Sequence, residues 1–327
     1  MGHKPLLFAA AFASFAALIS GCASYRATQA ENTYPPLGEF VEVTGGKVHY
    51  VQTGSGPHLI LIHGAGGNLR EFTFDMIDRL KDHYTVTAFD RPGLGYTDQV
   101  PGLETGPTAT EGDSPMDQAT MLREAATKIG IIDPIVVGHS FGGIVAYAWA
   151  LQGLDEDTPV NAKAIVSVAG VTMPWPGGLG RYYTHNGSAF GGAVTVPLIS
   201  AFVPRTYVRE QINAIFAPQS APEGYADYVG AGLTLRPDTF RANIRQVNTL
   251  RPHVVEMAKR YPELTLPIEI VHGTADTTVP ITIHAHEVAK IVDSVNITAL
   301  EGIGHMPHQI DPQSTIDAIN RAAVRAQ

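Results

Sequence analysis

The feature that most constrains the fold is the pentapeptide Gly-His-Ser-Phe-Gly at residues 138–142, because apolar runs lie on both sides of it. The run 135–137 precedes it and the run 144–151 follows it. This arrangement predicts a strand that turns sharply into a helix, with the serine held in a strained conformation at the apex. Glycines on either side of the serine let strand and helix approach closely. We therefore predict that the Ser140 hydroxyl projects from the edge of a sheet.

Strand-like and helix-like patterns alternate along most of the chain. The predicted strands are 40–43, 48–52, 58–62, 85–89, 135–137, 164–168, 268–271 and 296–300, the first two forming a hairpin. The predicted helices are 69–80, 116–129, 141–151, 281–292 and 311–323. Alternation of this kind predicts an α/β fold with a mostly parallel central sheet and helices on both faces.

Residues 171–262 interrupt this alternation and predict a mainly helical cap insertion over the strand ends, with helices near 208–216 and 239–257. Six aromatic residues of this segment could line a substrate pocket: Trp175, Tyr182, Tyr183, Phe190, Phe202 and Phe216. We expect most of them to form the core of the insertion and a minority to contact substrate. The core domain would then comprise residues 39–170 and 263–327.

Three further motifs follow predicted strands. His63 begins the segment His-Gly-Ala-Gly-Gly after the strand 58–62, Asp276 lies within 272–280, and His305 ends Glu-Gly-Ile-Gly-His after the last strand. With the serine pentapeptide, these motifs resemble the α/β-hydrolase family, which places nucleophile, acid and histidine in this order. The resemblance covers the chain from residue 40 onward. It implies a serine hydrolase with Ser140 as nucleophile, His305 as base and Asp276 as the acid that orients the histidine.

The same resemblance implies an oxyanion hole made of two backbone N–H groups. One belongs to Phe141, and the other to Ala65, with Gly66 as second choice. The family sometimes supplies its acid after the strand 164–168, but residues 169–174 contain none.

Other polar residues near these motifs have simpler interpretations. We interpret His63, His139 and Asp90 as structural residues beside the site, because buried histidines more often bond to backbone. His272, His284 and His286 lie on different predicted elements and lack the spacing of metal ligands, so no metal or cofactor is expected.

The identity of the nucleophile narrows the reaction. Family members similar to epoxide hydrolases and haloalkane dehalogenases have Asp at the position of Ser140, so serine favours acyl chemistry. The apolar insertion favours carboxylic esters with a hydrophobic moiety. Carbon–carbon bond hydrolases, cofactor-free haloperoxidases and small-peptide hydrolases use the same residues and remain alternatives, as does a non-catalytic binding lipoprotein that keeps the fold.

The N-terminus predicts secretion and lipidation. Lys4 precedes an apolar run to residue 19, and Ile-Ser-Gly-Cys at 19–22 resembles the bacterial lipoprotein signal, cleaved before a cysteine that is lipidated, for example with palmitate. Cys22 is the only cysteine. We expect a signal peptide at 1–21, a tether at 22–38, and a lipid anchor in the cell envelope. Ala23 favours the outer membrane of a Gram-negative bacterium.

The net charge of −9 argues against nucleic acid and against general adsorption to anionic lipid. The expected partners are therefore a small ester-type substrate and the membrane, the latter through the anchor alone.

Overall fold

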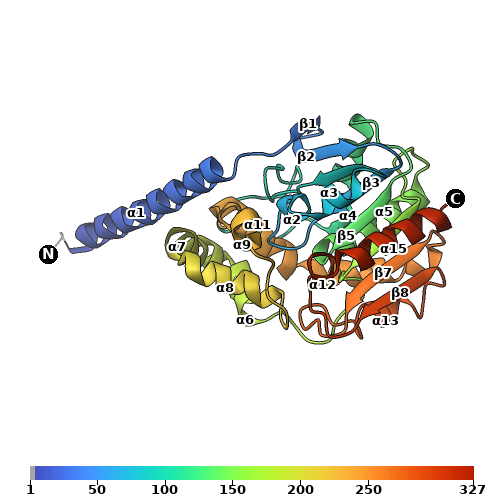
Figure 1. Ribbon diagram of the computed structural model, residues 1–327. Helices are drawn as coiled ribbons and strands as arrows, with labels where there is room; N and C mark the ends of the chain where they lie inside the picture. Colours follow the sequence, from blue (N-terminus) through green and yellow to red (C-terminus); the bar gives the residue numbers. More distant parts are fainter. Residues whose placement is uncertain (1–3) are drawn as a thin grey trace.

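An eight-stranded sheet forms the centre of the molecule (Figure 1). The computed structural model describes residues 4–327, and side-chain environments from residue 14 onward. The strands are β1 (Glu39–Val43), β2 (Gly46–Gly54), β3 (His58–Ile62), β4 (Thr85–Phe89), β5 (Ile135–His139), β6 (Ala164–Val168), β7 (Ile268–Gly273) and β8 (Val295–Leu300). Their order in the sheet is β1-β2-β4-β3-β5-β6-β7-β8. The pairs β1–β2 and β2–β4 are antiparallel, and all the other pairs are parallel. This sheet, with its helices, confirms the predicted fold class.

Helices cover both faces of the sheet. Helices α4 (Pro115–Lys128) and α5 (Phe141–Asp155) pack on one face, and α3 (Met76–Leu80) and α15 (Pro312–Arg325) on the other. The central strands β3, β5, β6 and β7 are buried almost throughout, as expected of parallel strands covered on both sides. This packing fixes the strand ends that carry the candidate site.

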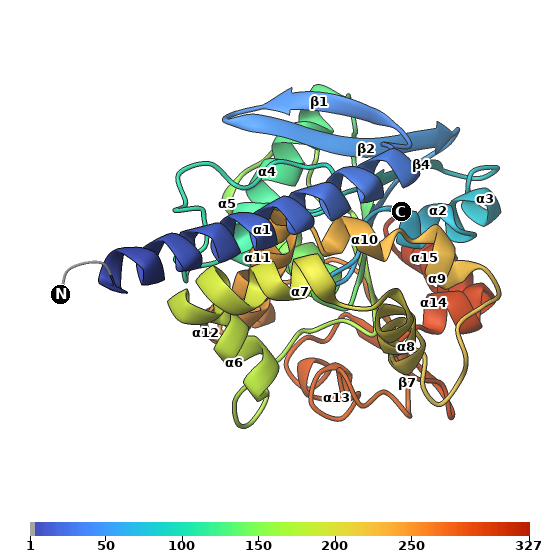
Figure 2. The same cartoon turned by 90° about the vertical axis from the view of Figure 1, so that its left-hand side faces the viewer.

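The segment between β6 and β7 is mainly helical and lies over the carboxyl ends of the strands (Figure 2). Its α-helices are α6 (Arg181–Gly187), α7 (Val196–Phe202), α8 (Arg205–Ile215), α9 (Tyr225–Tyr228), α10 (Ala231–Thr234), α11 (Pro237–Asn248) and α12 (Leu250–Ala258). A π-helical turn, η1 (Gly191–Thr195), precedes α7, and a 3-10 turn, η2 (Tyr261–Glu263), follows α12. We call residues 171–262 the cap.

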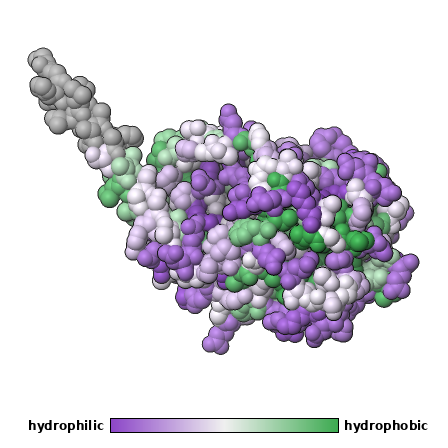
Figure 3. Space-filling view, turned by 90° about the horizontal axis from the view of Figure 1, so that it is seen from above, coloured by the Kyte–Doolittle hydropathy of each residue, from purple (hydrophilic) through white to green (hydrophobic). Residues whose placement is uncertain are grey.

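Helix α1 (Lys4–Thr33) crosses the cap and projects beyond it (Figures 1 and 2). Polar and apolar residues intermingle on the face of the molecule drawn in Figure 3. We expected residues 22–38 to be a tether, but the structure makes them helical as far as Thr33. Small residues explain the difference, because Ala23 packs on Ala201 of α7. Arg26 also donates to the Val203 carbonyl oxygen at 2.9 Å. Residues 1–3 of the expected signal peptide lie outside the described residues. None of the described helices has the length and apolarity needed to span a bilayer.

Two predicted helices differ from the structure. The predicted helix 69–80 divides into α2 (Arg70–Thr73) and α3, and the break lets Phe74 pack edge-on against Tyr225 and Tyr228 of the cap. Within the predicted helix 281–292, only α13 (Ala285–Val288) is α-helical. The remaining short helix of the core, α14 (Pro307–Ile310), immediately precedes α15.

Candidate active site

Ser140 occupies the sharp turn between β5 and α5. Its backbone dihedrals, φ 51° and ψ −115°, lie in a region that non-glycine residues rarely adopt. The turn is tight because glycines border it: a Cβ on Gly138 would lie 2.1 Å from the Gly142 carbonyl oxygen. A Cβ on Gly142 would lie 2.1 Å from the carbonyl oxygen of Ile62. The sequence thus forces strain on the serine and directs its hydroxyl away from the sheet.

The structure brings Ser140, His305 and Asp276 into one hydrogen-bonded row. His305 Nε2 lies 2.9 Å from Ser140 Oγ, and its Nδ1 lies 2.7 Å from Asp276 Oδ2. The other carboxylate oxygen, Oδ1, accepts the backbone N–H groups of Thr278 and Val279 at 2.8 and 2.9 Å. The three residues follow β5, β8 and β7, whose carboxyl ends lie at one edge of the sheet. With a proton on Nδ1, the imidazole can accept the serine proton at Nε2.

Electrostatics suit this proton transfer. Burial lowers the pKa of His305 below 6.5 despite the opposing effect of Asp276, so the ring is neutral at pH 7. Burial alone would raise the pKa of Asp276, but hydrogen bonds from His272 and His305 hold it well below its usual range. The arrangement therefore pairs a neutral base with a permanently ionised acid.

Phe141 and the turn 64–67 both lie next to the serine. Phe141 begins α5, and the first N–H groups of a helix have no partner within it. On the other side lies the turn formed by residues 64–67. There Gly66 donates its N–H to Asn243 Oδ1 at 2.6 Å, and its carbonyl accepts the Thr234 hydroxyl at 2.6 Å. The Gly66 N–H is thus already used, which favours Ala65 over Gly66 as the second oxyanion donor.

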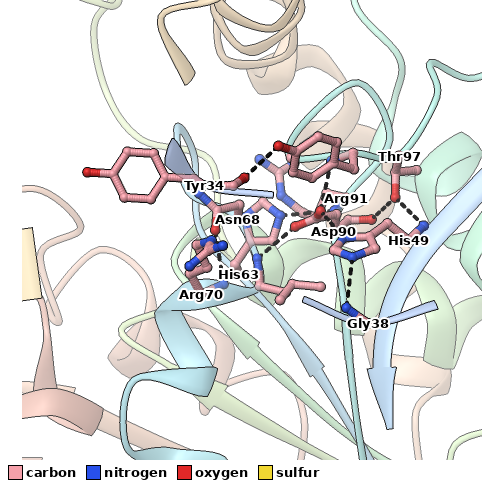
Figure 4. Close-up of polar contacts among 12 residues, drawn as sticks. Tyr34, Gly38, His49, His63, Asn68, Arg70, Asp90, Arg91 and Thr97 are labelled. Atoms are coloured by element: carbon pink, nitrogen blue, oxygen red, sulfur yellow. Dashed lines mark hydrogen bonds and ion pairs between the residues drawn. The ribbon is translucent and has the colours of Figure 1, made fainter. Parts of the chain in front are cut away.

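A buried polar network that includes His49, His63, Asp90 and Arg91 lies beside this turn (Figure 4). Asp90 accepts the Leu69 N–H at 2.7 Å and lies 2.6 Å from His49 Nδ1. The Arg91 backbone N–H donates to His63 Nε2 at 2.9 Å, and the Arg91 guanidinium reaches the Gly64 carbonyl at 3.3 Å. His63 and Asp90 thus hold the loops that follow β3 and β4.

A second buried cluster contacts the 64–67 turn, includes His139 next to Ser140, and reaches the backbone of His305. Glu71 Oε1 lies 2.7 Å from His139 Nδ1 and 3.2 Å from His308 Nε2, while Glu71 Oε2 accepts the Gly64 N–H at 3.3 Å. His139 Nε2 lies 3.1 Å from the carbonyl oxygen of His305. Burial opposes charge here, yet the mutual attraction raises the pKa of His139 and holds that of Glu71 well below its usual range.

This second cluster also bears on metal binding. Among the described residues, Glu71, His139 and His308 form the one group whose possible ligand atoms all lie within 4.8 Å of one another. The 2.7 Å separation of Glu71 and His139 is that of an ion pair between two charged groups. Two of the histidines weighed as metal ligands on sequence have other partners. His284 Nδ1 lies 3.2 Å from the N–H groups of Thr172 and Met173, and His272 Nε2 lies 2.7 Å from the Val279 carbonyl oxygen. The third, His286, is exposed.

A cavity of about 220 Å³ opens in front of the serine. Its floor is polar, with Ser140, His305 and the 64–67 turn, and its walls are mainly apolar. The apolar and aromatic walls come from Tyr183, Ile212, Ile215, Phe216, Tyr225, Val229 and Met306. Of the six aromatic residues named from sequence, only Tyr183 and Phe216 line this cavity. Phe190 and Phe202 are more than half exposed.

Residues 59–318 match the model described as the Alpha/beta hydrolase family, and the chain belongs to that family. The protein is accordingly a hydrolase of this fold. A soluble epoxide hydrolase of Corynebacterium is 28% identical over 288 residues, covering 84% of this chain and 93% of the relative.

Two solved structures share the fold. The epoxide hydrolase CorEH has a TM-score of 0.70 at 22% identity, covering 88% of this chain and 99% of its own. The esterase RhEst1 from Rhodococcus has a TM-score of 0.65 at 20% identity, covering 89% and 99%.

Three residues of the site escaped the sequence analysis: Glu71, Asn243 and Thr234. Glu71 lies in an amphipathic segment where an acid is expected to face solvent, and the other two lie in the cap, far from residues 64–67 in sequence. The contacts of these three residues depend on how distant segments of the chain pack together, and local sequence patterns do not predict that packing.

Proposed function

We propose that the protein is a serine hydrolase that cleaves carboxylic esters with a hydrophobic moiety through an acyl-enzyme. The main support is the row Ser140–His305–Asp276, with its 2.9 and 2.7 Å contacts and its strained serine. The apolar walls of the cavity support a hydrophobic substrate.

In the proposed reaction, Ser140 Oγ attacks the ester carbonyl carbon while His305 Nε2 takes the hydroxyl proton. The N–H groups of Ala65 and Phe141 stabilise the oxyanion, each contributing roughly 100-fold or more to the rate. The tetrahedral intermediate then expels the alcohol, which receives the proton from His305. Water, deprotonated by His305, attacks the acyl-enzyme, and collapse of the second intermediate releases the acid and restores the Ser140 hydroxyl.

The named relatives support hydrolysis but differ in substrate. The relative named an epoxide hydrolase favours epoxide opening, whereas a serine at residue 140 favours acyl transfer, as in the neighbour named an esterase. We give the nucleophile more weight, because it takes part in the bond that forms.

A fluorophosphonate probe tests the nucleophile directly. We expect one adduct on Ser140 in the folded protein and none in Ser140→Ala. Turnover of a short-chain aryl ester should be lost in Ser140→Ala and nearly lost in His305→Ala, with Asp276→Asn severe but milder. A folded wild-type protein that forms no adduct would support the non-catalytic lipoprotein instead.

A substrate panel separates the chemical alternatives. Esters, lactones, thioesters, amides, epoxides, a vinylogous 1,5-diketone for carbon–carbon cleavage, and halide with peroxide for haloperoxidase activity should be compared in wild type and Ser140→Ala. We expect Ser140-dependent activity to be highest on apolar esters. Higher activity on the diketone, the amides or the halide would assign one of the other reactions.

We further propose that Cys22 carries a lipid anchor that holds the protein in the cell envelope, at the outer membrane of a Gram-negative bacterium. The support is the sequence Ile-Ser-Gly-Cys at 19–22. Metabolic labelling with an alkyne analogue of palmitate should mark wild type and spare Cys22→Ser. Equal labelling of both proteins would contradict the anchor.

A further inference from the structure

A second cavity, of about 190 Å³, lies between α1 and the cap. It adjoins the catalytic cavity, because Ile212 and Ala231 line both. Figure 2 shows α1 passing across the cap, whose helices form the other walls of this second cavity. We call this space the α1 cavity.

Helix α8 presents one face to the α1 cavity. Arg205, Val208, Arg209 and Ile212 all line it, and their spacing of three and four residues places them on the same side of the helix. The cationic end is at Arg205, and the apolar end at Ile212 meets the catalytic cavity. From the helical rise, the two ends are about 10 Å apart.

Helix α1 and the residue after it form the opposing wall. Arg26 lies at one end of this wall, and the small apolar residues Ala27 and Ala30 follow it. Gln29, Thr33 and Tyr34 also line the cavity, so this wall is mixed in polarity beyond its cationic end.

The positive charge of the α1 cavity is only partly compensated. Asp227 pairs with Arg209, but among the described residues neither Arg26 nor Arg205 pairs with a carboxylate. Burial, and then the charge of Arg205, lower the pKa of Arg26, which places the two guanidinium groups within each other's field. An anion placed between them would relieve this repulsion.

An unsatisfied hydroxyl provides an independent observation. Ser200 lines the α1 cavity, is 98% buried, and its Oγ has no hydrogen-bond partner among the described residues. Buried polar groups normally have a partner, and this hydroxyl beside a cationic cavity lacks one.

We propose that the α1 cavity binds the anionic head of an amphiphile, a carboxylate or phosphate, whose alkyl chain passes Ile212 toward the catalytic cavity. Arg26 and Arg205 hold the anion, and Ser200 donates to it. Val208, Ala30 and Ile212 contact the chain.

Calorimetric titration of the intact Ser140→Ala chain tests the proposal without any hydrolysis. The probes are dodecanoate, dodecyl phosphate, dodecanol and inorganic phosphate, at one fixed concentration of nonionic detergent. Arg205→Glu reverses the charge, and Arg26→Gln removes charge while keeping an amide donor for Val203. The exposed Arg181→Ala, on the cap outside the cavity, is the matched control.

We expect Arg205→Glu to weaken binding of at least one dodecyl anion roughly tenfold or more, and Arg26→Gln severalfold. Dodecanol binding should not change, and Arg181→Ala should behave like its parent. The anion that binds more tightly identifies the head group as carboxylate or phosphate.

Three results would overturn the proposal. They are unchanged anion affinity in Arg205→Glu, an equal loss of dodecanol affinity, and binding of inorganic phosphate as tight as that of dodecyl phosphate. The proposal would also fail if the protein bound anionic vesicles in an Arg205-dependent way but did not bind the dodecyl anions. That result would mean that these arginines contact a membrane surface. If the wild-type protein did not hydrolyse esters, the binding titrations could still be interpreted. That result would count only against the proposed function.

Discussion

The carboxylate of Glu71 lies 2.7 Å from His139 Nδ1, and this buried ion pair joins the segments that carry the site. Glu71 also accepts the N–H of Gly64, next to Ala65, and His139 precedes Ser140 and contacts the His305 carbonyl. One carboxylate therefore links the 64–67 turn with the segments that carry Ser140 and His305.

Replacing Glu71 with Gln should lower the kcat for ester hydrolysis about tenfold or more with little change in KM. The amide keeps the size of the side chain but leaves the His139 imidazolium without a counter-charge, so the catalytic segments shift relative to one another. Steady-state kinetics on an aryl ester measure both parameters. Asp78→Asn, an exposed acid on α3, is the matched control and should change neither.

The expectation for Glu71 fails if kcat is unchanged in a folded Glu71→Gln protein. A rise in KM alone would also contradict it, because that would make Glu71 a substrate-contacting residue. Circular dichroism and the yield of the fluorophosphonate adduct distinguish both results from misfolding.

The free energy of unfolding should fall as pH drops from 6.5 toward 4. Burial lowers the pKa of His63, His284 and His308 to about 4 each. Between pH 4 and pH 6.5 these three histidines are protonated in the unfolded chain but neutral in the folded chain. Their contribution to the free energy of unfolding is therefore fully present above pH 6.5 and is lost as the pH falls toward 4. These three groups alone would give a slope of about 4 kcal/mol per pH unit. Burial raises the pKa of Asp113 to about 6, which offsets about one of the three protons.

The structural cause of this slope can be tested at one residue. His63 Nε2 accepts the Arg91 N–H, which a protonated ring cannot do. His63→Gln keeps an acceptor without titrating, so denaturant unfolding of this variant should depend on pH less steeply, by about one proton. An identical slope in variant and wild type would exclude His63 from the effect.

Ester hydrolysis should have an acid limb with a midpoint below pH 6.5. Burial lowers the pKa of His305, and only the neutral ring can accept the Ser140 proton. The ratio kcat/KM for a neutral ester should therefore be fully developed at pH 7 and decline as His305 becomes protonated. A midpoint at or above 6.5 would contradict the assigned base.

Ser140→Gly should be more stable than Ser140→Ala by about 1 kcal/mol. Elsewhere glycine destabilises by roughly 0.5–1 kcal/mol relative to alanine, but relief of strain at φ 51° is worth about 1–3 kcal/mol. Chemical denaturation of the two inactive variants gives the difference. If alanine proves the more stable, the turn stores no strain at Ser140.

Local patterns predict those parts of the fold that local chemistry determines. The strands 58–62, 85–89 and 164–168 have the bounds expected from sequence, because each is a short run of mainly apolar and β-branched residues. The Ser140 turn was predictable for a similar reason, since glycines and serine alone specify its geometry. Asp276 and His305 could be named because each follows a strand.

Long-range packing accounts for what could not be predicted. Helix α1 is ordered as far as Thr33 because Ala23 and Arg26 contact the cap, about 180 residues away in sequence. The predicted helix 281–292 shortens to α13, where the His284 ring is tied to the backbone N–H groups of Thr172 and Met173. Asn243 shares no sequence pattern with Gly66, although it fixes that turn.

The cap leaves the sheet after β6 and returns at β7, and these two strands are paired neighbours, with Val168 opposite Val271. The excursion therefore starts and finishes at almost the same place, so its length and sequence can vary without moving the strands. Natural variation or laboratory grafting could replace this whole segment and change the cavity walls, while Ser140, Asp276 and His305, on the loops after β5, β7 and β8, keep their spacing.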